Sequence, residues 1–282
     1  AEPVDPAKGA VALLQGAERP LVRGSLRADT FSVAATPGSA PSSSGGSATG
    51  ATGGGATGWS TTPIDVSGLF SADLEVRLQL GRLSAGNMVV APVNLRVTNT
   101  SGRAGTQIDQ IGLYGGMLGG QLVVDENGGL SVRTDLLLAD VQLSPLSASL
   151  AGYDRLEGRG SASLAVLAVG NDMDTLMLSL DGQGDLALGA GAIRGLDIGG
   201  MIRNRDASFQ GEGARTVFDS LTANFDISGG VLQNGDLLMD APWGGVTGAG
   251  AVDIGAQTLD YRLVPGIQRQ DGDGAGLQVP IL

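Results

Sequence analysis

Apolar and polar residues alternate along most of this chain, and the alternation is most regular between Thr216 and Pro265. Apolar residues occupy every second position from Leu221 to Ile227, with polar residues between them. Successive side chains of a β-strand point to opposite faces, so this spacing predicts a strand with one apolar and one polar face. The next pair, Gly229-Gly230, suits the positive φ angles of a tight turn.

Three more strands are predicted after this turn. Their apolar positions are, in order, Leu237 and Met239, then Val246, Val252 and Ile254, then Leu259, Tyr261 and Leu263. Ala241-Pro242 is expected to end the second strand and Pro265 the fourth, because proline has no N–H to donate to a sheet. Four strands at hairpin spacing predict an antiparallel meander.

The same alternation fills the chain upstream. Weak strands are predicted at 9–14 and 24–33, and stronger ones from Ser71 onward, over 74–80, 91–98, 108–114, 121–124 and 130–138. Each of the stronger strands has one polar face, so we expect a sheet with one wetted side and one apolar side.

Three segments interrupt the alternation with helical signals. Residues 143–150 begin near Ser144 as a candidate cap with Pro145 in the first turn, and Gly152 follows the end. Residues 172–180 follow Asn171 or Asp172 as a cap, and a short turn is expected over 198–203. Helices this short are not stable alone, so they must pack on the sheet.

Residues 36–58 contain only Gly, Ser, Ala, Thr and Pro. Such a segment has too little apolar surface to offset its ordering entropy, and we expect a flexible loop within the sheet. The expected organisation is therefore N-terminal strands over 1–35, this loop over 36–58, and one β unit over 59–282.

The motifs of the chain resemble those of the AsmA family of bacterial envelope proteins. They include T-x-F-x-x-L-x-A-x-F-x-I-x-x-G-V from Thr216, then D-L-x-M-D-x-P, G-x-G-x-V-D-I and L-D-Y-R-L-x-P. Upstream, W-S-x-x-P-I-D from Trp59, L-Y-G-G from Leu113 and L-D-G-Q-G before G-A-I-R-G-L-D fit the same family, and the similarity begins near Gly24. All are turn and strand patterns without catalytic character.

The resemblance implies a long antiparallel meander curled into an open, taco-like groove with two or three short helices. It also implies a periplasmic location, a tether to the inner membrane upstream of Ala1, and a sheet that continues beyond Leu282. The family is proposed to handle phospholipids between envelope membranes and is also linked to outer-membrane protein assembly.

Charge and composition exclude several other classes. The formal charge is −12, with sixteen arginines and one lysine. A chain this acidic, without a run of basic residues, is not expected to bind nucleic acid or anionic lipid head groups. No segment approaches the roughly 20 apolar residues of a membrane-spanning helix.

Catalytic and metal-binding chemistry is also disfavoured, and we expect no enzyme, no cofactor and no metal site. The chain has no histidine and no cysteine, which removes Ser-His triads and thiolate zinc sites. The carboxylate pair Asp172/Asp174 is predicted to cap a helix, and the pair Asp271/Asp273 to lie in a solvated turn. The G-x-G triplets at 182–184, 211–213 and 248–250 lack the rest of a phosphate loop.

The apolar stripe remains as the functional signal, and two interpretations stay open. It is either the sealed core of a sandwich or barrel, which the residues alone favour, or an open groove for phospholipid acyl chains. Few aromatic residues and too few helices to cover the sheet point to the groove, and the resemblance to the AsmA family makes the groove the preferred interpretation. The candidate groove residues are Leu74, Val76, Leu78, Val93, Leu95, Val97, Leu221, Phe225, Ile227, Leu237, Met239, Val252, Ile254, Leu259 and Tyr261. The alternative function is a structural factor for outer-membrane protein assembly, working with envelope protein partners and without lipid transfer.

Overall fold

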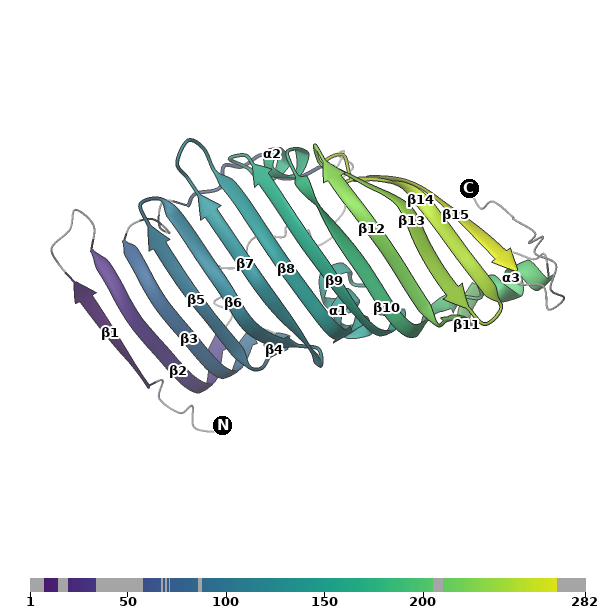
Figure 1. Ribbon diagram of the computed structural model, residues 1–282, viewed down its shortest axis with the longest axis horizontal. Coiled ribbons are helices and arrows are strands. Elements are labelled where there is room, and N and C mark those ends of the chain that lie inside the picture. Colours follow the sequence, from purple (N-terminus) through teal and green to yellow (C-terminus); the bar gives the residue numbers. More distant parts are fainter. Residues whose placement is uncertain are drawn as a thin grey trace, which may run out of the picture.

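The computed structural model describes residues 8–14, 20–33, 58–66, 68, 70, 72–85, 88–204 and 210–267. The low-complexity segment 36–58, apart from Gly58, and the Asp271/Asp273 pair lie outside these residues. The described part forms one long, twisted sheet of 15 strands that is not closed into a barrel (Figure 1). The predicted mainly β fold is confirmed.

Thirteen strands lie side by side in one path across the sheet. In spatial order they are β1 (Lys8–Leu14), β2 (Leu21–Val33), β3 (Asp73–Ala85), β5 (Val93–Thr100), β6 (Arg103–Leu113), β7 (Gly116–Asp125), β8 (Ser131–Gln142), β9 (Leu156–Val169), β10 (Asp181–Leu196), β12 (Ser220–Ser228), β13 (Val231–Ala241), β14 (Gly244–Asp253) and β15 (Thr258–Ile267). Two strands lie off this path: β4 (Met88–Val90) pairs with β3, and β11 (Gln210–Phe218) pairs with β10.

The sheet is antiparallel except at one place. β2 and β3 are parallel, with Leu21 opposite Asp73 and Leu26 opposite Leu78. The prediction of a purely antiparallel meander is therefore wrong at this pair. A parallel pair needs a long crossover, and the connection from 34 to 72 provides one. Alternation specifies which face a side chain takes, and it carries no information about strand direction.

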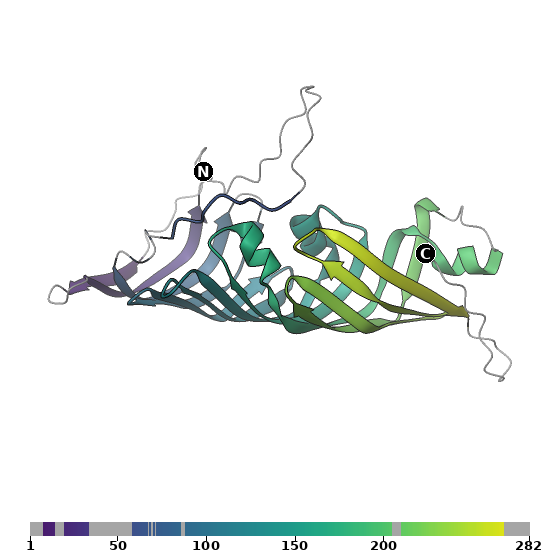
Figure 2. The same cartoon turned by 90° about the horizontal axis from the view of Figure 1, so that it is seen from above.

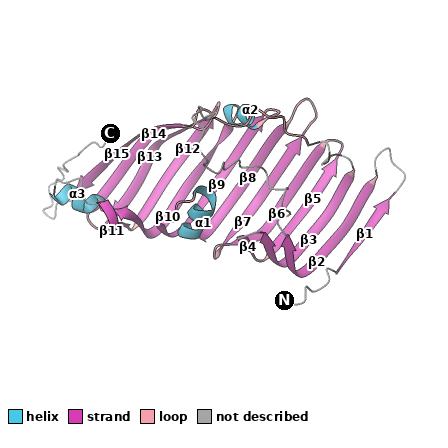
Figure 3. Ribbon diagram, turned by 180° about the vertical axis from the view of Figure 1, so that it is seen from behind, coloured by secondary structure: helices cyan, strands magenta, loops and turns pink. Residues whose placement is uncertain are grey.

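The expected helices form with small differences. α1 (Leu143–Ala151) begins after Gln142, whose side chain makes no capping bond, so Ser144 is not the cap. Gly152 ends it in the left-handed conformation, at φ 66°. α2 (Met173–Leu178) and α3 (Ile198–Asn204) lie where they were predicted. Figures 2 and 3 show that all three helices lie on one side of the sheet.

Two predicted strand ends are misplaced. β15 continues through Pro265 to Ile267, because a strand at the edge of the sheet tolerates a missing N–H on its open side. β14 ends at Asp253, so Ile254 lies in the turn beyond it. The second strand of the meander ends at Ala241 as expected.

Cross-strand partners place most apolar side chains of the sheet on one face, although Leu137, Leu167 and Leu238 lie exposed on the other. Leu188 of β10 lies opposite Leu221 of β12, which lies opposite Met239 of β13. Nearer the N-terminal edge, Leu78 of β3 lies opposite Leu95, which lies opposite Ile108. Directly opposed residues point to the same face, so these rows form one apolar face, and the helices lie on this side.

Bulges keep the apolar face continuous where the alternation changes phase. β13 carries the irregularity, between Asn234 and Leu237. Its pairing with β14 shifts register there, and so does its pairing with β12, between Thr222 and Phe225. Without the shift, Leu237 would point to the polar face, because a one-residue slip reverses every side chain.

Candidate functional site

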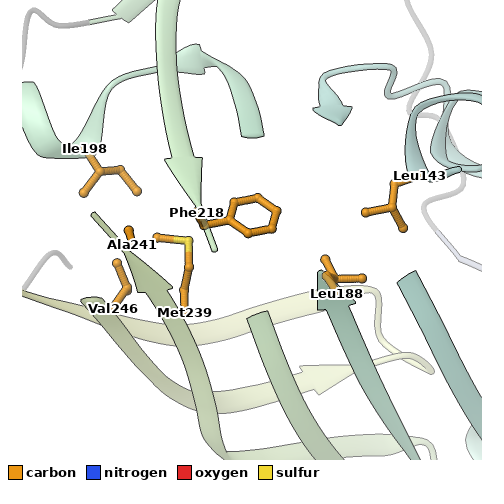
Figure 4. Close-up of a cluster of buried hydrophobic side chains, with 7 residues drawn as sticks. All are labelled: Leu143, Leu188, Ile198, Phe218, Met239, Ala241 and Val246. Carbon is orange, nitrogen blue, oxygen red and sulfur yellow. The ribbon is translucent and has the colours of Figure 1, made fainter. Parts of the chain in front are cut away.

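Fully buried apolar residues gather along the two margins of the apolar face, where the strands end. At one margin Leu143, Leu188, Ile198, Phe218, Met239, Ala241 and Val246 form a cluster (Figure 4). This cluster joins α1, α3 and β11 to the ends of β10, β13 and β14. A smaller cluster of Leu80, Val90 and Val93 continues the same margin toward the N-terminal edge. Helices and short strands therefore cover this margin, which is the lower one in Figure 1.

The opposite, upper margin is covered by α2 and by a segment that we call the strap, residues 58–66. The strap is fastened at three points. Trp59 Nε1 donates to the Ile254 carbonyl at 2.6 Å, the Ile64 N–H donates to the Asn171 carbonyl at 2.8 Å, and the Asp174 N–H donates to the Ser60 carbonyl at 3.2 Å. Buried side chains along this margin are Ala104, Leu130, Ala168, Leu176 and Ile227.

Between the two margins, the middle rows of the apolar face are only partly covered. None of the larger side chains in these rows is fully buried, and Leu122 and Leu263 are each 37% exposed. We call these rows the apolar floor, which consists of Val76, Leu78, Leu95, Val97, Ile108, Leu122, Leu136, Leu164, Val166, Leu186, Ala223, Phe225, Leu237 and Leu263.

The apolar floor is long and lacks charged side chains. It crosses eleven strands, from β3 to β15, and ten inter-strand spacings of about 4.8 Å give it a length of about 48 Å. The polar side chains that lie among these rows carry no charge; they are those of Thr106, Thr134, Asn234 and Tyr261. An apolar surface of this length with covered margins and a partly exposed middle differs from a close-packed core, whose residues are fully buried.

Aromatic rings on the floor lie over glycines of the neighbouring strand. Phe225 of β12 lies opposite Gly184 of β10, and a Cβ added at Gly184 would approach the ring to 2.5 Å. In the same way Tyr261 of β15 lies opposite Gly250 and close to Gly248. Gly184, Gly248 and Gly250 of the G-x-G triplets are therefore strand positions that make room for rings, whereas a Cβ at Gly182 would meet Ala165 and Val166.

Tyr261 closes a small polar cluster at the C-terminal end of the floor. Its hydroxyl donates to Asn234 Oδ1, and Asn234 Nδ2 donates to the Asn224 carbonyl at 2.7 Å and to Asp236 Oδ1 at 2.8 Å. Burial raises the pKa of Tyr261, and the negative charge of Asp236 adds to this effect. Hydrogen bonds from Asn224 lower the pKa of Asp236. Both shifts fit a neutral phenol beside an ionised carboxylate.

Fourteen of the fifteen candidate groove residues lie on the apolar face. Ile254 lies outside the strands: it follows β14, its carbonyl accepts from Trp59 of the strap, and its N–H donates to the carbonyl of Gly230. Val93, Ile227 and Met239 are buried at the margins, whereas Leu259 is 71% exposed on the edge strand β15. The remaining members, such as Phe225 and Leu95, are partly exposed.

The central strands supply floor residues that the sequence analysis did not select. Ile108, Leu136, Leu164 and Leu186 come from β6, β8, β9 and β10 and join the two groups of selected residues. Their strands carry the same alternation, and β6 and β8 were among the predicted strands. What identifies these residues is that they lie in the same cross-strand rows as Leu95 and Phe225. Only the pairing of the strands shows this.

The residues considered for chemistry have structural roles in the described part of the chain. The Asp172 carboxylate accepts the Thr175 N–H at 2.8 Å and forms a capping box at the start of α2. Within the described ranges, no group of three His, Cys, Asp or Glu residues could hold a metal ion. No helix among the described residues is long and apolar enough to cross a bilayer.

A family model, that of the AsmA family, matches residues 21–237. The matched segment extends from β2 into β13 and contains all three helices and most of the floor. The chain belongs to the AsmA family. Comparisons with curated proteins and with solved structures find no match.

Proposed function

We propose that this AsmA-family protein binds phospholipid acyl chains along its apolar floor, and conducts them, as part of lipid homeostasis in the bacterial cell envelope. One observation carries the proposal. Most apolar side chains of the eleven strands from β3 to β15 share one face, and that face is covered at both margins and partly exposed between them.

Exposed apolar surface is costly in water, at about 25 cal/mol per Å². Contiguous apolar patches beyond a few hundred Å² therefore mark binding surfaces in soluble domains. A floor about 48 Å long greatly exceeds the half-thickness of a bilayer's hydrocarbon core, about 15 Å. Acyl chains lying end to end match both its length and its aliphatic, uncharged lining.

The side chains of the floor are suited to binding an apolar ligand and not to catalysing a reaction. Its lining offers aliphatic and aromatic surface, and its few polar groups are hydroxyls and an amide. We propose that the protein is not an enzyme and needs no cofactor or metal.

Family membership supports a place in the cell envelope. We propose the periplasm, with a tether to the inner membrane. There the floor could shield acyl chains from water between two membranes. Envelope proteins that contact its ends are the expected protein partners.

The test is a charge placed in the middle of the floor. Phe225→Asp puts a carboxylate among floor side chains that water reaches, so the fold should survive while acyl chains are repelled. Thr222→Asp is the matched control, because Thr222 is exposed on the polar face of the same strand, opposite Leu238 and Ala187. Asn224 is unsuitable as a control, since its amide donates to Asp236 Oδ2 at 2.6 Å.

Both variants and the parent are purified in mild detergent and compared by native mass spectrometry and thermal unfolding. We expect bound phospholipid on the parent and on Thr222→Asp, and its loss from Phe225→Asp with a modest fall in melting temperature. An empty parent floor together with outright unfolding of Phe225→Asp would support a sealed core. That outcome would favour the alternative role as a structural factor in outer-membrane protein assembly.

A further inference from the structure

The polar face, opposite the apolar face, carries two arginines in direct opposition. Arg77 of β3 is the cross-strand partner of Arg96 of β5, and both side chains are exposed. Like charges directly opposite one another destabilise a sheet. In a chain of net charge −12, a carboxylate at either position would be the expected partner.

Two carboxylates of neighbouring positions already pair with other arginines. Glu75, two residues before Arg77, accepts from Arg23 at 2.7 Å. Asp125 of β7 pairs with Arg103 at 3.4 Å, and its pKa is lowered, first by a hydrogen bond from the Asn127 backbone. Arg77 and Arg96 form no ion pair or hydrogen bond within the ranges that the structure describes. Two positive charges are therefore left without a counter-ion.

A hollow of about 440 Å³ opens beside Arg96 on this face. Its centre is Gly105 of β6, which lies opposite Thr98 of β5 and Val123 of β7 and has no side chain to fill the space. Polar side chains line it, and most of them already have a partner: Thr98 donates to the Gly105 carbonyl, Gln107 to the Gly120 carbonyl, Gln121 to Asp135, and Arg103 pairs with Asp125. Among the described residues, the guanidinium of Arg96 is the one cation of this lining without an ion-pair or hydrogen-bond partner.

We propose that Arg77, Arg96 and the hollow over Gly105 form a binding site for a phosphate group. Guanidinium groups offer planar, paired donors that match phosphate oxygens, and such charge-assisted bonds are stronger than neutral ones. A bound dianion removes the repulsion between the two arginines. The site lies on the face opposite the floor, so it is independent of acyl-chain binding there. A free phosphate compound and a lipid head group share this chemistry.

The first experiment compares binding of inorganic phosphate to the whole chain by calorimetry and by thermal shift, with chloride as the reference at equal ionic strength. Arg77→Gln/Arg96→Gln should bind phosphate at least about tenfold more weakly, the loss expected for charged hydrogen bonds. Without phosphate this double variant should melt no lower than the parent, because the like-charge pair is gone.

The matched control is Arg133→Gln/Arg262→Gln. It removes the same charge from exposed arginines of the polar face in β8 and β15, and it should bind phosphate as the parent does. An equal loss of phosphate binding in both double variants would mean that the net charge of the protein causes the effect. That result would refute the proposed site. A parent that shows no response to phosphate beyond that to chloride would overturn it as well.

A second variant keeps every charge and fills the hollow. A Cβ at Gly105 would lie 3.1 Å from Thr98 Oγ1, a contact that a hydroxyl can relax by rotation, and valine suits a strand. Gly105→Val should fold and lose phosphate binding as the arginine variant does. Full binding by a folded Gly105→Val would contradict the hollow as the site.

Vesicles identify the source of the phosphate. Cosedimentation with phosphatidylglycerol vesicles and not with phosphatidylcholine vesicles, abolished in Arg77→Gln/Arg96→Gln, supports the site with a lipid head group as its ligand. Phosphate binding without cosedimentation supports the site with a soluble phosphate compound as its ligand.

Discussion

The indole Nε1 of Trp59 donates a hydrogen bond of 2.6 Å to the backbone carbonyl of Ile254, although 195 residues separate the two in sequence. This bond ties the strap to the turn after β14, near the C-terminal edge of the sheet. It is one of three fastenings that hold the strap over the upper margin of the apolar face.

Replacing Trp59 by Phe should loosen the strap. The variant loses this hydrogen bond, and we expect a destabilisation of about 1 kcal/mol, the usual net value of such a bond. The Ile64 amide, which donates to Asn171, should exchange faster with solvent. Denaturant unfolding and hydrogen exchange provide the two measurements. Thr61→Ala, in the same strap and exposed, should change neither, and unchanged Ile64 exchange in Trp59→Phe would show that the other fastenings suffice.

The ring of Phe225 requires the absence of a side chain at Gly184. A Cβ at this position would collide with the Ser163 backbone oxygen and with the ring. Gly184→Ala should therefore destabilise the sheet by about 1–3 kcal/mol, the range for overpacking. The measurement is the urea midpoint. Gly235→Ala is the control, because nothing lies within 4 Å of its added Cβ; equal losses would refute the steric explanation.

The capping box of α2 should contribute measurably to stability. Asp172→Ala removes the acceptor of the Thr175 N–H, and a lost cap costs about 1 kcal/mol. Asp172→Asn should restore most of this stability, because Asn caps helices about as well as Asp does. Thermal unfolding of the three proteins checks the prediction, and a poorly stable Asn variant would indicate that charge matters more than the hydrogen bond.

The pair of Asp140 and Arg159 should give a pH-dependent contribution to stability. Arg159 Nε donates to Asp140 Oδ1 at 2.7 Å, and this bonding lowers the pKa of the Asp140 carboxyl. Because the native carboxyl binds its proton less tightly than the unfolded one, the contribution is present above the ordinary aspartate pKa of about 3.9. It is lost as the pH falls through the lowered native pKa.

Asp140→Asn tests this linkage. The difference in urea midpoint between the parent and this variant should be constant from about pH 5 to about pH 7 and should shrink below about pH 4. The background is Arg159→Gln, in which replacing Asp140 should have no pH-dependent effect. A difference that persists at low pH would mean that the variant acts through packing and not through the ion pair.

Much of the fold could be predicted because it is local. The alternation from Leu221 to Ile227 specifies a strand with two unlike faces, Asp172 caps its helix through a residue three positions away, and Gly152 ends α1 by its own backbone conformation. The cap predicted at Ser144 lies two residues earlier, at Gln142, which is a local error. Each of these features depends on neighbours within a few residues.

The candidate site was predicted only in part, because it depends on pairing between distant strands. Leu95 and Phe225 were recognised as apolar strand residues, but Leu164 joins them into one floor only through the registers of β8, β9 and β10. The exposure of the floor's middle rows also has no local signal. An alternating strand looks the same whether its apolar face meets a second layer or remains open.

The sequence by itself determined the β class, the existence of an apolar face, the family and the places of the three helices, because periodicity and turn chemistry act over short distances. The tertiary structure alone decided the parallel pairing of β2 with β3, the bulge that turns Leu237 to the floor, the strap fastened at Ile254, and the opposition of Arg77 and Arg96. These depend on which strands become neighbours and in which register, and that choice is made by the burial and hydrogen bonding of the whole sheet.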